Sequence, residues 1–362
     1  MQNKHKKKIC LVVFSLGEGG AEKSSAILSK ILYDLGHDIH IVSVLDKVDF
    51  AYKGQLLNLG LLKKKNPGIL GRLKRLAVFK KFLKENSFDF VIDNRPRIGF
   101  LKEFVLSRLV YKPQKTIYCI RSYNTDLYIH PNPFLARLIY GKAFKLVAVS
   151  KAIFIKLKDD YRFSNIELIY NPISFEDNAS ELQENDGVYI LFFGRLDDDV
   201  KNISLLLEGY TRSILRQNQV KLKILGDGKD YQFLKAKADD MDLGDSVEFM
   251  GYIKEPDSII RKALFTVLTS RWEGFPRALL ESLQYGIPVV SVDCKSGPSE
   301  IVQHEQNGLL IENNNPDALA DALNRMYDDK QLYLHCRSNA KLSVARFSED
   351  AIAESWKKIL NN

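Results

Sequence analysis

Short apolar runs alternate with amphipathic segments along the whole chain. Continuous apolar strands that alternate with helices are typical of parallel sheets that are covered on both faces. In the first half, strands are predicted at residues 9–15, 39–45, 88–93, 115–121, 145–149 and 166–170, and helices at 21–35 and 151–158. In the second half, strands are predicted at 188–193, 221–225, 246–250, 265–268, 289–292 and 308–311, and helices at 202–215, 231–241, 256–262, from 277, 316–328, 330–345 and 349–360. The pattern predicts an α/β protein with two doubly wound parallel sheets.

A polar, acidic segment without periodicity separates the two halves. It covers residues 171–187 and is predicted to be a linker. The domains are therefore expected at 1–170 and 188–345, and the last segment, 346–362, is expected to pack as a helix against the first domain. A length of 362 residues with 45% apolar and 27% charged side chains fits two soluble domains. The four cysteines have no metal-ligand spacing, and we expect reduced thiols.

Charge is distributed unevenly between the halves. The net charge of +8 divides into +17 for residues 1–170 and −9 for residues 171–362. Residues 51–84 contain no acid, and between positions 63 and 84 many Lys and Arg side chains alternate with Leu, Ile and Phe. This stretch is predicted to be an amphipathic basic helix. A solvated surface helix is one interpretation, and contact with an anionic membrane surface through residues 63–84 is the one we favour.

The basic start of the chain is followed by an apolar run, which imitates a signal peptide. The run at 9–16 is short and leads directly into Gly17-Glu18-Gly19-Gly20 without a cleavage-type sequence. It is therefore predicted to be the first buried strand. No run approaches the roughly 18 apolar residues of a membrane-spanning helix.

Two glutamates flank a predicted helix start in the second half. Glu273 precedes a turn, Gly274-Phe275-Pro276, and Glu281 lies inside the helix that begins near Arg277. Free N–H groups at a helix start can bind an anion or a hydroxyl group. One acid beside that site and one further along could hold two parts of a polar ligand. The alternative is that both are solvated helix charges.

Two cations follow the first strand of the second half. Gly194 and Arg195 come directly after this strand, and Lys201 lies six residues further on. An Arg fork and a mobile Lys near a helix start suit a diphosphate. The alternative is surface pairing with the acids at 197–199. Further glycines end the next two strands, at 226 and 251, which indicates a ligand cleft at the carboxyl ends of the strands.

Together these strings resemble the signatures of retaining glycosyltransferases of family 4. The E-x7-E signature matches residues 273–281, and F-F-G-R-L-D-D-D-V-K-N at 192–202 is similar to the family's G-R-x5-K diphosphate element. The resemblance covers essentially the whole chain and is most specific over 187–311. It implies the GT-B fold, with two Rossmann-like domains facing a central cleft.

The resemblance also implies a role for individual residues. Arg195 and Lys201 would neutralise the leaving nucleotide diphosphate, and Glu273 would hold the donor sugar as the third catalytic residue. Glu281 would accept hydrogen bonds from the ribose hydroxyls. The remaining donor-binding positions would be Gly19, Gly20, Gly194, Gly251, Gly274, Phe275 and Pro276. Retention of configuration follows from the resemblance alone, and no metal or other cofactor is expected, although Asp197-Asp198-Asp199 imitates a metal-binding D-x-D.

The acceptor side departs from the family pattern. Many relatives carry a His on a loop of the first domain, where this chain has Arg121-Ser122-Tyr123-Asn124. Arg121 cannot act as a base at neutral pH. It could instead bind an anionic or phosphorylated acceptor, with Asn124 as a second candidate. A purely structural role for Arg121 remains equally open.

The predicted function is transfer of a sugar, with UDP-hexose or UDP-N-acetylhexosamine favoured, to a lipid-linked or polysaccharide acceptor in cell-envelope glycan synthesis. The expected location is cytoplasmic, peripheral on the inner face of the membrane. A dinucleotide-dependent dehydrogenase would need glycine where Glu22 stands. A nucleic-acid binder is disfavoured because the second half is acidic and no nucleic-acid motif is present. Another GT-B enzyme, an epimerase or a phosphorylase, is the nearest alternative.

Overall fold

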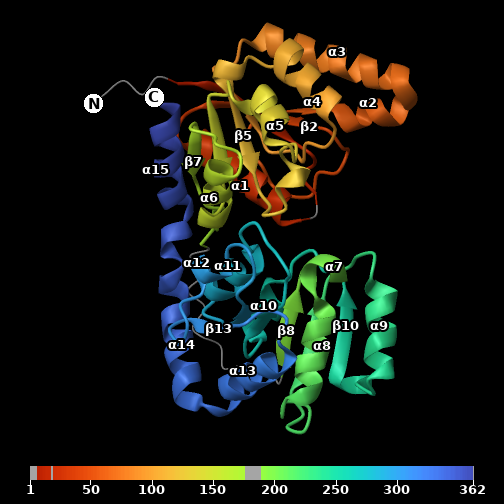
Figure 1. Ribbon diagram of the computed structural model, residues 1–362, viewed down its shortest axis with the longest axis vertical. Helices are drawn as coiled ribbons and strands as arrows, with labels where there is room; N and C mark the ends of the chain where they lie inside the picture. The colour runs from red at the N-terminus through yellow and green to blue at the C-terminus, as the bar shows by residue number, and fades with distance from the viewer. Residues whose placement is uncertain (1–5, 18, 176–188, 362) are drawn as a thin grey trace. The chain divides into compact units, whose positions relative to one another are not determined.

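The computed structural model describes residues 6–17, 19–175 and 189–361. These residues form two compact units, and each unit is built around one parallel sheet. The first unit holds the described residues up to Ser174 together with those from Glu349 onwards, and the second holds the others (Figure 1). The prediction of two doubly wound parallel-sheet domains is confirmed. Most of the predicted linker, 171–187, lies outside the described residues.

The first sheet has the strand order β3-β2-β1-β4-β5-β6-β7, and all neighbouring strands in it are parallel. Its central strands are buried, apart from Lys8 at the start of β1, because helices cover both faces. Parallel strands end at the same edge of a sheet, so the loops after β1, β4, β5, β6 and β7 gather there. The strands are β1 (Lys8–Val13), β2 (Asp38–Ser43), β3 (Gln55–Asn58), β4 (Phe90–Asp93), β5 (Thr116–Ile120), β6 (Lys145–Ala148) and β7 (Ile166–Leu168).

The helices of the first unit include one that comes from the far end of the chain. They are α1 (Gly20–Asp34), α2 (Leu59–Lys65), α3 (Gly68–Asn86), α4 (Phe100–Val105), the π-helical η1 (Leu106–Val110), the short η2 (Pro113–Lys115) and η3 (Thr125–Leu127), α5 (Pro133–Tyr140), α6 (Lys151–Asp159) and α15 (Glu349–Leu360). α15 contacts α1, and its Ile352, Trp356 and Ile359 join the core that includes Ile27 and Ile31. The last segment of the chain is therefore part of the first unit.

The basic stretch is not the single helix that its pattern predicts. It contains β3, then α2, then α3, with a break at Asn66 and Pro67. A proline has no N–H to continue a helix, and it disfavours the helical conformation of the residue before it. Asn66 accordingly leaves the helical region, at φ −135° and ψ 81°. The two helices therefore begin and end independently.

The second sheet has the strand order β10-β9-β8-β11-β12-β13, again with parallel neighbours. The strands are β8 (Tyr189–Phe193), β9 (Lys221–Leu225), β10 (Val247–Gly251), β11 (Thr266–Leu268), β12 (Val289–Val292) and β13 (Gly308–Ile311). The helices are α7 (Asp198–Lys201), α8 (Ile203–Arg212), α9 (Tyr231–Asp240), the short η4 (Gly244–Ser246), α10 (Asp257–Lys262), α11 (Arg277–Gln284), α12 (Pro298–Ile301), α13 (Pro316–Asp328), α14 (Lys330–Ser343) and the short η5 (Ala345–Phe347). Within the described ranges, none of the helices of either unit combines the length and the hydropathy that a transmembrane span requires.

Candidate active site

Three strand ends of the second sheet meet through their backbones. The N–H of Gly194, after β8, donates to Leu225 at 2.9 Å, and the N–H of Gly226 donates to the carbonyl of Gly251 at 2.8 Å. A Cβ at position 226 would overlap the carbonyl oxygen of Gly194. Glycine is required at position 226 because two chain segments approach closely there. Gly251 has φ 69°, a left-handed conformation that favours glycine.

The loop after β8 places the two predicted cations in different surroundings. Arg195 is exposed, with 68% of its side chain accessible, and its nearest ion partner is Asp197 at 4.0 Å. Lys201 ends α7, and its carbonyl accepts a hydrogen bond from the Thr269 hydroxyl at 3.0 Å. Its ammonium turns toward the loop after β11. The structure therefore does not bring Arg195 and Lys201 into direct contact within the described residues.

Glu273 is the partner of Lys201. Its Oε1 accepts from Lys201 Nζ at 2.5 Å and from the Ser270 hydroxyl at 2.6 Å. The two ion-pair side chains are only 18% and 12% exposed, Lys201 first. The Glu273 backbone is tied to the loop after β12, because its N–H donates to Lys295 at 2.9 Å and Ser296 Oγ donates to the carbonyl of Gly274 at 2.9 Å. Glu273 and Lys201 are therefore held in a fixed orientation before any ligand binds.

The turn after Glu273 leads into α11. Phe275 is buried and packs edge-to-face on Phe347, with ring centroids 5.1 Å apart. Pro276 is the residue before the helix, at ψ 107°, and α11 begins at Arg277. This start leaves the first N–H groups of α11 without partners inside the helix. Such groups, beside a carboxylate and a lysine, suit the oxygens of a sugar or a phosphate.

Glu281 lies on α11 and pairs with a residue that the sequence analysis assigned no role. Arg277 Nε and Nη2 both donate to Glu281 Oε1, at 3.2 and 2.9 Å, and both side chains are buried. The spacing of four residues places the pair on one face of the helix, so an opposite-charge search at i, i+4 would have found it. Ser270 and Ser296 were also missed. They act on Glu273 and Gly274 from loops, and no periodicity marks them.

The predicted residues of the first unit lie at two places in the chain, the start of α1 and the segment after β5. Gly19 caps α1 with φ 112°, and Gly20 is the first residue of that helix. Arg121 follows β5 and donates to two asparagine side chains, Asn94 and Asn171, which the sequence analysis did not identify. Asn124 is exposed, and its N–H donates to the Ser122 hydroxyl oxygen at 3.2 Å.

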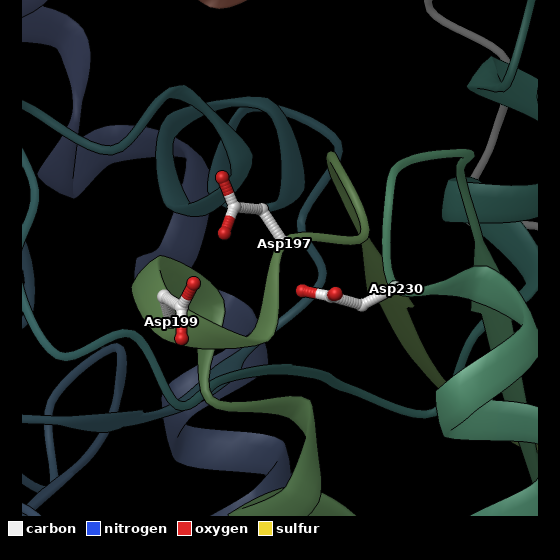
Figure 2. A group of neighbouring side chains, drawn as sticks. All are labelled: Asp197, Asp199 and Asp230. Atoms are coloured by element: carbon white, nitrogen blue, oxygen red, sulfur yellow. The ribbon is translucent and has the colours of Figure 1, made fainter.

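Three acids of the second unit lie close enough together to be considered as metal ligands (Figure 2). Oxygens of Asp197, Asp199 and Asp230 lie within 4.8 Å of one another. The Lys229 ammonium contacts all three, at 3.2, 2.5 and 4.0 Å, and its hydrogen bond holds the pKa of Asp199 below the ordinary value. A cation would have to displace Lys229, so the geometry gives no positive support for a metal here. The absence of a metal remains a prediction.

A buried cysteine lies beside the candidate site. Burial raises the pKa of the Cys294 thiol well above its ordinary value, and the Glu273 carboxylate adds to this effect. Since the thiolate is the reactive form, Cys294 is a packing residue rather than a nucleophile. The chemistry of the site therefore rests on carboxylates, cations and backbone N–H groups.

Two parallel-sheet units with a polar, charged site at the carboxyl ends of the second sheet define a protein of the GT-B class. Comparison with known proteins agrees. The family model described as glycosyl transferases group 1 matches residues 174–343. The chain is 31% identical, over 98% of its length and 99% of the relative's, to the N-acetylgalactosamine-N,N'-diacetylbacillosaminyl-diphospho-undecaprenol 4-alpha-N-acetylgalactosaminyltransferase of Campylobacter jejuni. The chain belongs to this glycosyltransferase family and is a glycosyltransferase.

Two further similarities agree with this assignment. The lipopolysaccharide 1,6-galactosyltransferase of Escherichia coli is 32% identical over 41% of this chain and 42% of its own length. The crystal structure of Anabaena HepE in complex with UDP-glucose superposes with a TM-score of 0.79 at 20% identity, covering 98% of this chain and 99% of the other. The fold class, the family and the enzyme class predicted from the sequence are confirmed. The roles of individual residues are not tested by these similarities and stay predictions.

Proposed function

We propose that the protein is a retaining transferase that moves a hexose or an N-acetylhexosamine from a UDP-sugar to a lipid-linked or polysaccharide acceptor of the cell envelope. The observation that carries the proposal is the pre-set pair of Lys201 and Glu273 at the carboxyl edge of the second sheet. The names of two relatives include diphospho-undecaprenol and lipopolysaccharide, which supports an acceptor of this class. These names specify different sugars, N-acetylgalactosamine and galactose, so the donor has to be identified by experiment.

The proposed mechanism assigns charge stabilisation to the cations. Departure of UDP builds negative charge on the β-phosphate, and preorganised cations and N–H groups stabilise that charge best where water is excluded. Lys201 is fixed by Glu273, and Arg195 has an exposed fork that can bind two phosphate oxygens. The start of α11 supplies backbone donors for the sugar, next to Gly274 and Phe275. Glu281, which Arg277 orients, accepts hydrogen bonds from the ribose hydroxyls.

The first unit is proposed to meet the membrane that carries the acceptor. The second half of α3 packs inward, since Phe79 contacts Tyr111 and Phe82 contacts Phe88, with ring centroids 5.9 and 5.5 Å apart. The first half exposes Ile69, Leu70 and Leu73, and Leu70 is 82% exposed. Basic side chains of α2 and α3 surround these apolar ones, over a stretch without acids.

A neighbouring helical face has the same character. α4, η1 and α5 contact one another. These helices and the segment before α4 expose Ile98, Leu101, Leu109, Phe134 and Leu138. Apolar side chains among Lys and Arg, with few acids, match the interface of an anionic bilayer. These exposed apolar and basic side chains support a peripheral position on the inner face of the membrane. Figure 1 shows α2, α3, α4 and α5 in the first unit.

A panel of nucleotide sugars tests the enzymatic proposal. A donor that binds only the folded state raises the melting temperature. The donor found in this way is then incubated with lipid-linked and glycan acceptors, and the products are separated. A glycosylated acceptor with free UDP and an unchanged anomeric configuration supports the proposal. An isomerised nucleotide sugar would indicate an epimerase, a sugar 1-phosphate formed from a glycan and added inorganic phosphate would indicate a phosphorylase, and either result without a glycosylated acceptor would refute transfer.

Sedimentation with anionic vesicles tests the membrane contact. Each basic side chain near such a surface contributes about 1 kcal/mol. Neutralising Lys74, Arg75, Lys80 and Lys81 to Gln should therefore weaken binding by up to about 4 kcal/mol at low salt. Leu70→Ser should also weaken it, whereas Leu342→Ser, at a leucine of the second unit that is 79% exposed, is the matched control. Unchanged vesicle binding in the first two variants would contradict the proposal.

A further inference from the structure

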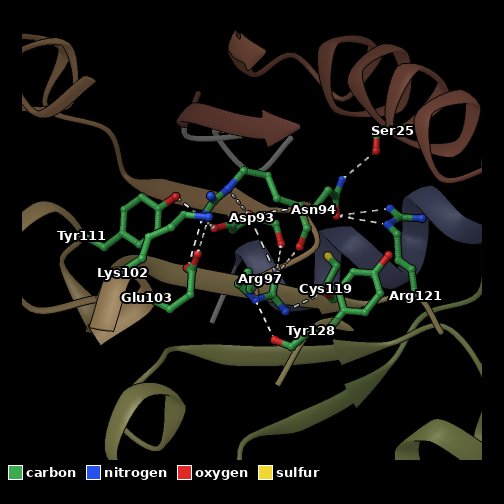
Figure 3. A network of polar contacts seen from close by, with 11 residues as sticks. Ser25, Asp93, Asn94, Arg97, Lys102, Glu103, Tyr111, Cys119, Arg121 and Tyr128 are labelled. Atoms are coloured by element: carbon green, nitrogen blue, oxygen red, sulfur yellow. Dashed lines mark hydrogen bonds and ion pairs between the residues drawn. The ribbon is translucent and has the colours of Figure 1, made fainter. Parts of the chain in front are cut away.

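Arg121 is held by neutral side chains at the carboxyl edge of the first sheet. Its Nε and Nη2 donate to Asn94 Oδ1 at 3.4 and 3.2 Å, and its Nη1 donates to Asn171 Oδ1 at 2.7 Å. Asn94 follows β4, Arg121 follows β5 and Asn171 follows β7, so three strand ends contribute to the arrangement. Figure 3 shows Arg121 and Asn94 at this edge. We call Asn94, Arg121 and Asn171 the Arg121 triad.

The triad is rigid because its asparagines are buried and tied to their surroundings. Asn94 is 4% exposed and Asn171 is 6% exposed. Asn94 Nδ2 donates to the Ser25 hydroxyl of α1 at 3.2 Å, which fixes the amide plane (Figure 3). Arg121 itself is only partly covered. The guanidinium therefore keeps one orientation while part of it remains accessible.

The acids nearest to Arg121 in this network are matched by other cations. Arg95 Nη2 lies 2.6 Å from Asp93 Oδ2 and 3.4 Å from Glu103 Oε2, and Arg97 Nη1 lies 3.8 Å from Asp93 Oδ1. Arg95 and Arg97 balance the charge of these two acids, and Lys102 Nζ adds a further cation 3.2 Å from Glu103 Oε1. Among the described residues, Arg121 takes part in none of the ion pairs, so no acid of this network compensates its charge. Figure 3 shows Asp93, Arg97 and Glu103 of this network together with Arg121.

An arginine in this state is suited to bind an oxyanion. A guanidinium has five N–H donors in one plane, and the triad uses three of them. Its planar fork matches two oxygens of a phosphate, and charge-assisted hydrogen bonds are the strongest of their kind. One wall of the small cavity beside Arg121 is apolar, formed by Leu28, Val147 and Trp356. No counter-charge comes from that side.

We propose that the Arg121 triad is a binding site for a phosphate group of one of the two substrates. The inference rests on the proposed function, which supplies two phosphate-bearing molecules, the nucleotide sugar and a lipid-linked acceptor. Both present the same chemistry, a phosphate diester or diphosphate oxyanion. The triad binds and orients this group and takes no part in bond cleavage.

The sharpest variant is Asn171→Asp. It keeps the shape of the side chain and retains the acceptor oxygen for Arg121 Nη1, but it supplies the counter-ion that the triad lacks. Phosphate binding should fall, and a melting curve checks that the variant is folded. Arg121→Gln removes the charge directly, and Arg121→Lys keeps the charge but loses the fork. Arg137→Gln, an exposed arginine on α5, is the matched control for loss of one positive charge.

Binding is measured with inorganic diphosphate by titration calorimetry. The full chain carries Arg195→Gln and Lys201→Met as background, so that the cations of the second unit do not obscure the first. The loss of a charge-assisted hydrogen bond removes enough binding free energy to weaken diphosphate binding about 10-fold or more. We expect this loss for Asn171→Asp and Arg121→Gln and none for Arg137→Gln. No diphosphate binding in the background chain, or equal binding by Asn171→Asp, would overturn the proposal.

Transfer kinetics identify the source of the phosphate. If Arg121→Gln raises KM for the donor only, the group is the donor diphosphate, and if it raises KM for the acceptor only, the group belongs to the acceptor. Either result supports the site, and unchanged values for both substrates in a folded variant would refute it. Failure of the proposed function is distinguishable, because a chain without transfer activity would still bind inorganic diphosphate through Arg121.

Discussion

The ion pair of Lys201 and Glu273 permits a test that separates catalysis from stability. Lys201→Met removes the ammonium that lies 2.5 Å from Glu273 Oε1 but keeps a side chain of similar length. Lys237 and Glu208 form a comparable pair in the same unit, 2.8 Å apart with side chains 27% and 37% exposed, Lys237 first. Lys237→Met is therefore the matched control, since it breaks a Lys–Glu pair on α8 and α9.

The expected magnitudes follow from exposure and from the proposed role. Loss of Lys201 leaves the mostly buried Glu273 with the Ser270 hydroxyl as a donor, which should cost about 1–3 kcal/mol of unfolding free energy. The control pair is more exposed, and its loss should cost at most about 1 kcal/mol. Removal of one preorganised group that stabilises developing negative charge lowers kcat about 100- to 1000-fold. The effect on rate should therefore exceed the effect on stability.

The assay is the initial rate of UDP release in the presence of acceptor, with a melting curve for each variant. A melting shift of about 2–4 °C per kcal/mol is expected for a unit of this size. Lys201→Met should remain folded at 25 °C and lose transfer, Lys201→Arg should recover part of it, and Lys237→Met should transfer at the wild-type rate. A loss of less than about 10-fold in a folded Lys201→Met would refute the assigned role.

Two further predictions concern buried charges. Burial raises the pKa of Asp93, but Arg95 and Arg97 outweigh this effect and hold the folded-state pKa below its ordinary value. The carboxylate therefore stabilises the fold above about pH 4, and this stabilisation is lost as the pH falls through the folded-state pKa. Asp93→Asn should lower stability by about 3–5 kcal/mol at pH 7 and flatten the acid limb of a pH–melting curve, and an unchanged acid limb would contradict this. Arg277→Ala should weaken UDP binding about 10-fold in calorimetry, because Glu281 loses two orienting bonds, with Arg277→Lys recovering part of the affinity.

The strand pattern predicted most of the fold because parallel strands in a covered sheet are almost wholly apolar. β9 and β12 were predicted with the bounds that the structure shows. β3 was missed because Gln55–Asn58 lies at the edge of its sheet, where its residues are only partly buried and carry no strong pattern. α4 and η1 were missed because polar and apolar residues follow one another there without a clean period. The order of strands in each sheet depends on packing, which no local pattern encodes.

The candidate site was predictable at its strand ends and not in its pairings. Lys201 and Glu273 are 72 positions apart, and their contact depends on how two loops fold over the same sheet edge. Arg277 and Glu281 are four positions apart on one helix, so the sequence contained their contact. Asn171 contacts Arg121 across 50 positions, through the order of β5, β6 and β7. Short-range pairs are readable from spacing, whereas long-range pairs need the topology.

The two units differ in how their cations are compensated, and this bears on the salt dependence of phosphate binding. In the second unit, Lys201 and Arg277 each hold a carboxylate before a ligand arrives, so a phosphate that binds beside either of them shares a cation that already has an anionic partner. In the first unit, Arg121 is held by amides, and a phosphate that binds there gains an interaction without losing one. Residues 1–170 carry a net charge of +17, and Arg121 is one defined position of this excess. A phosphate bound at Arg121 would depend on salt more steeply than one bound beside Lys201, because only the former neutralises an unpaired charge.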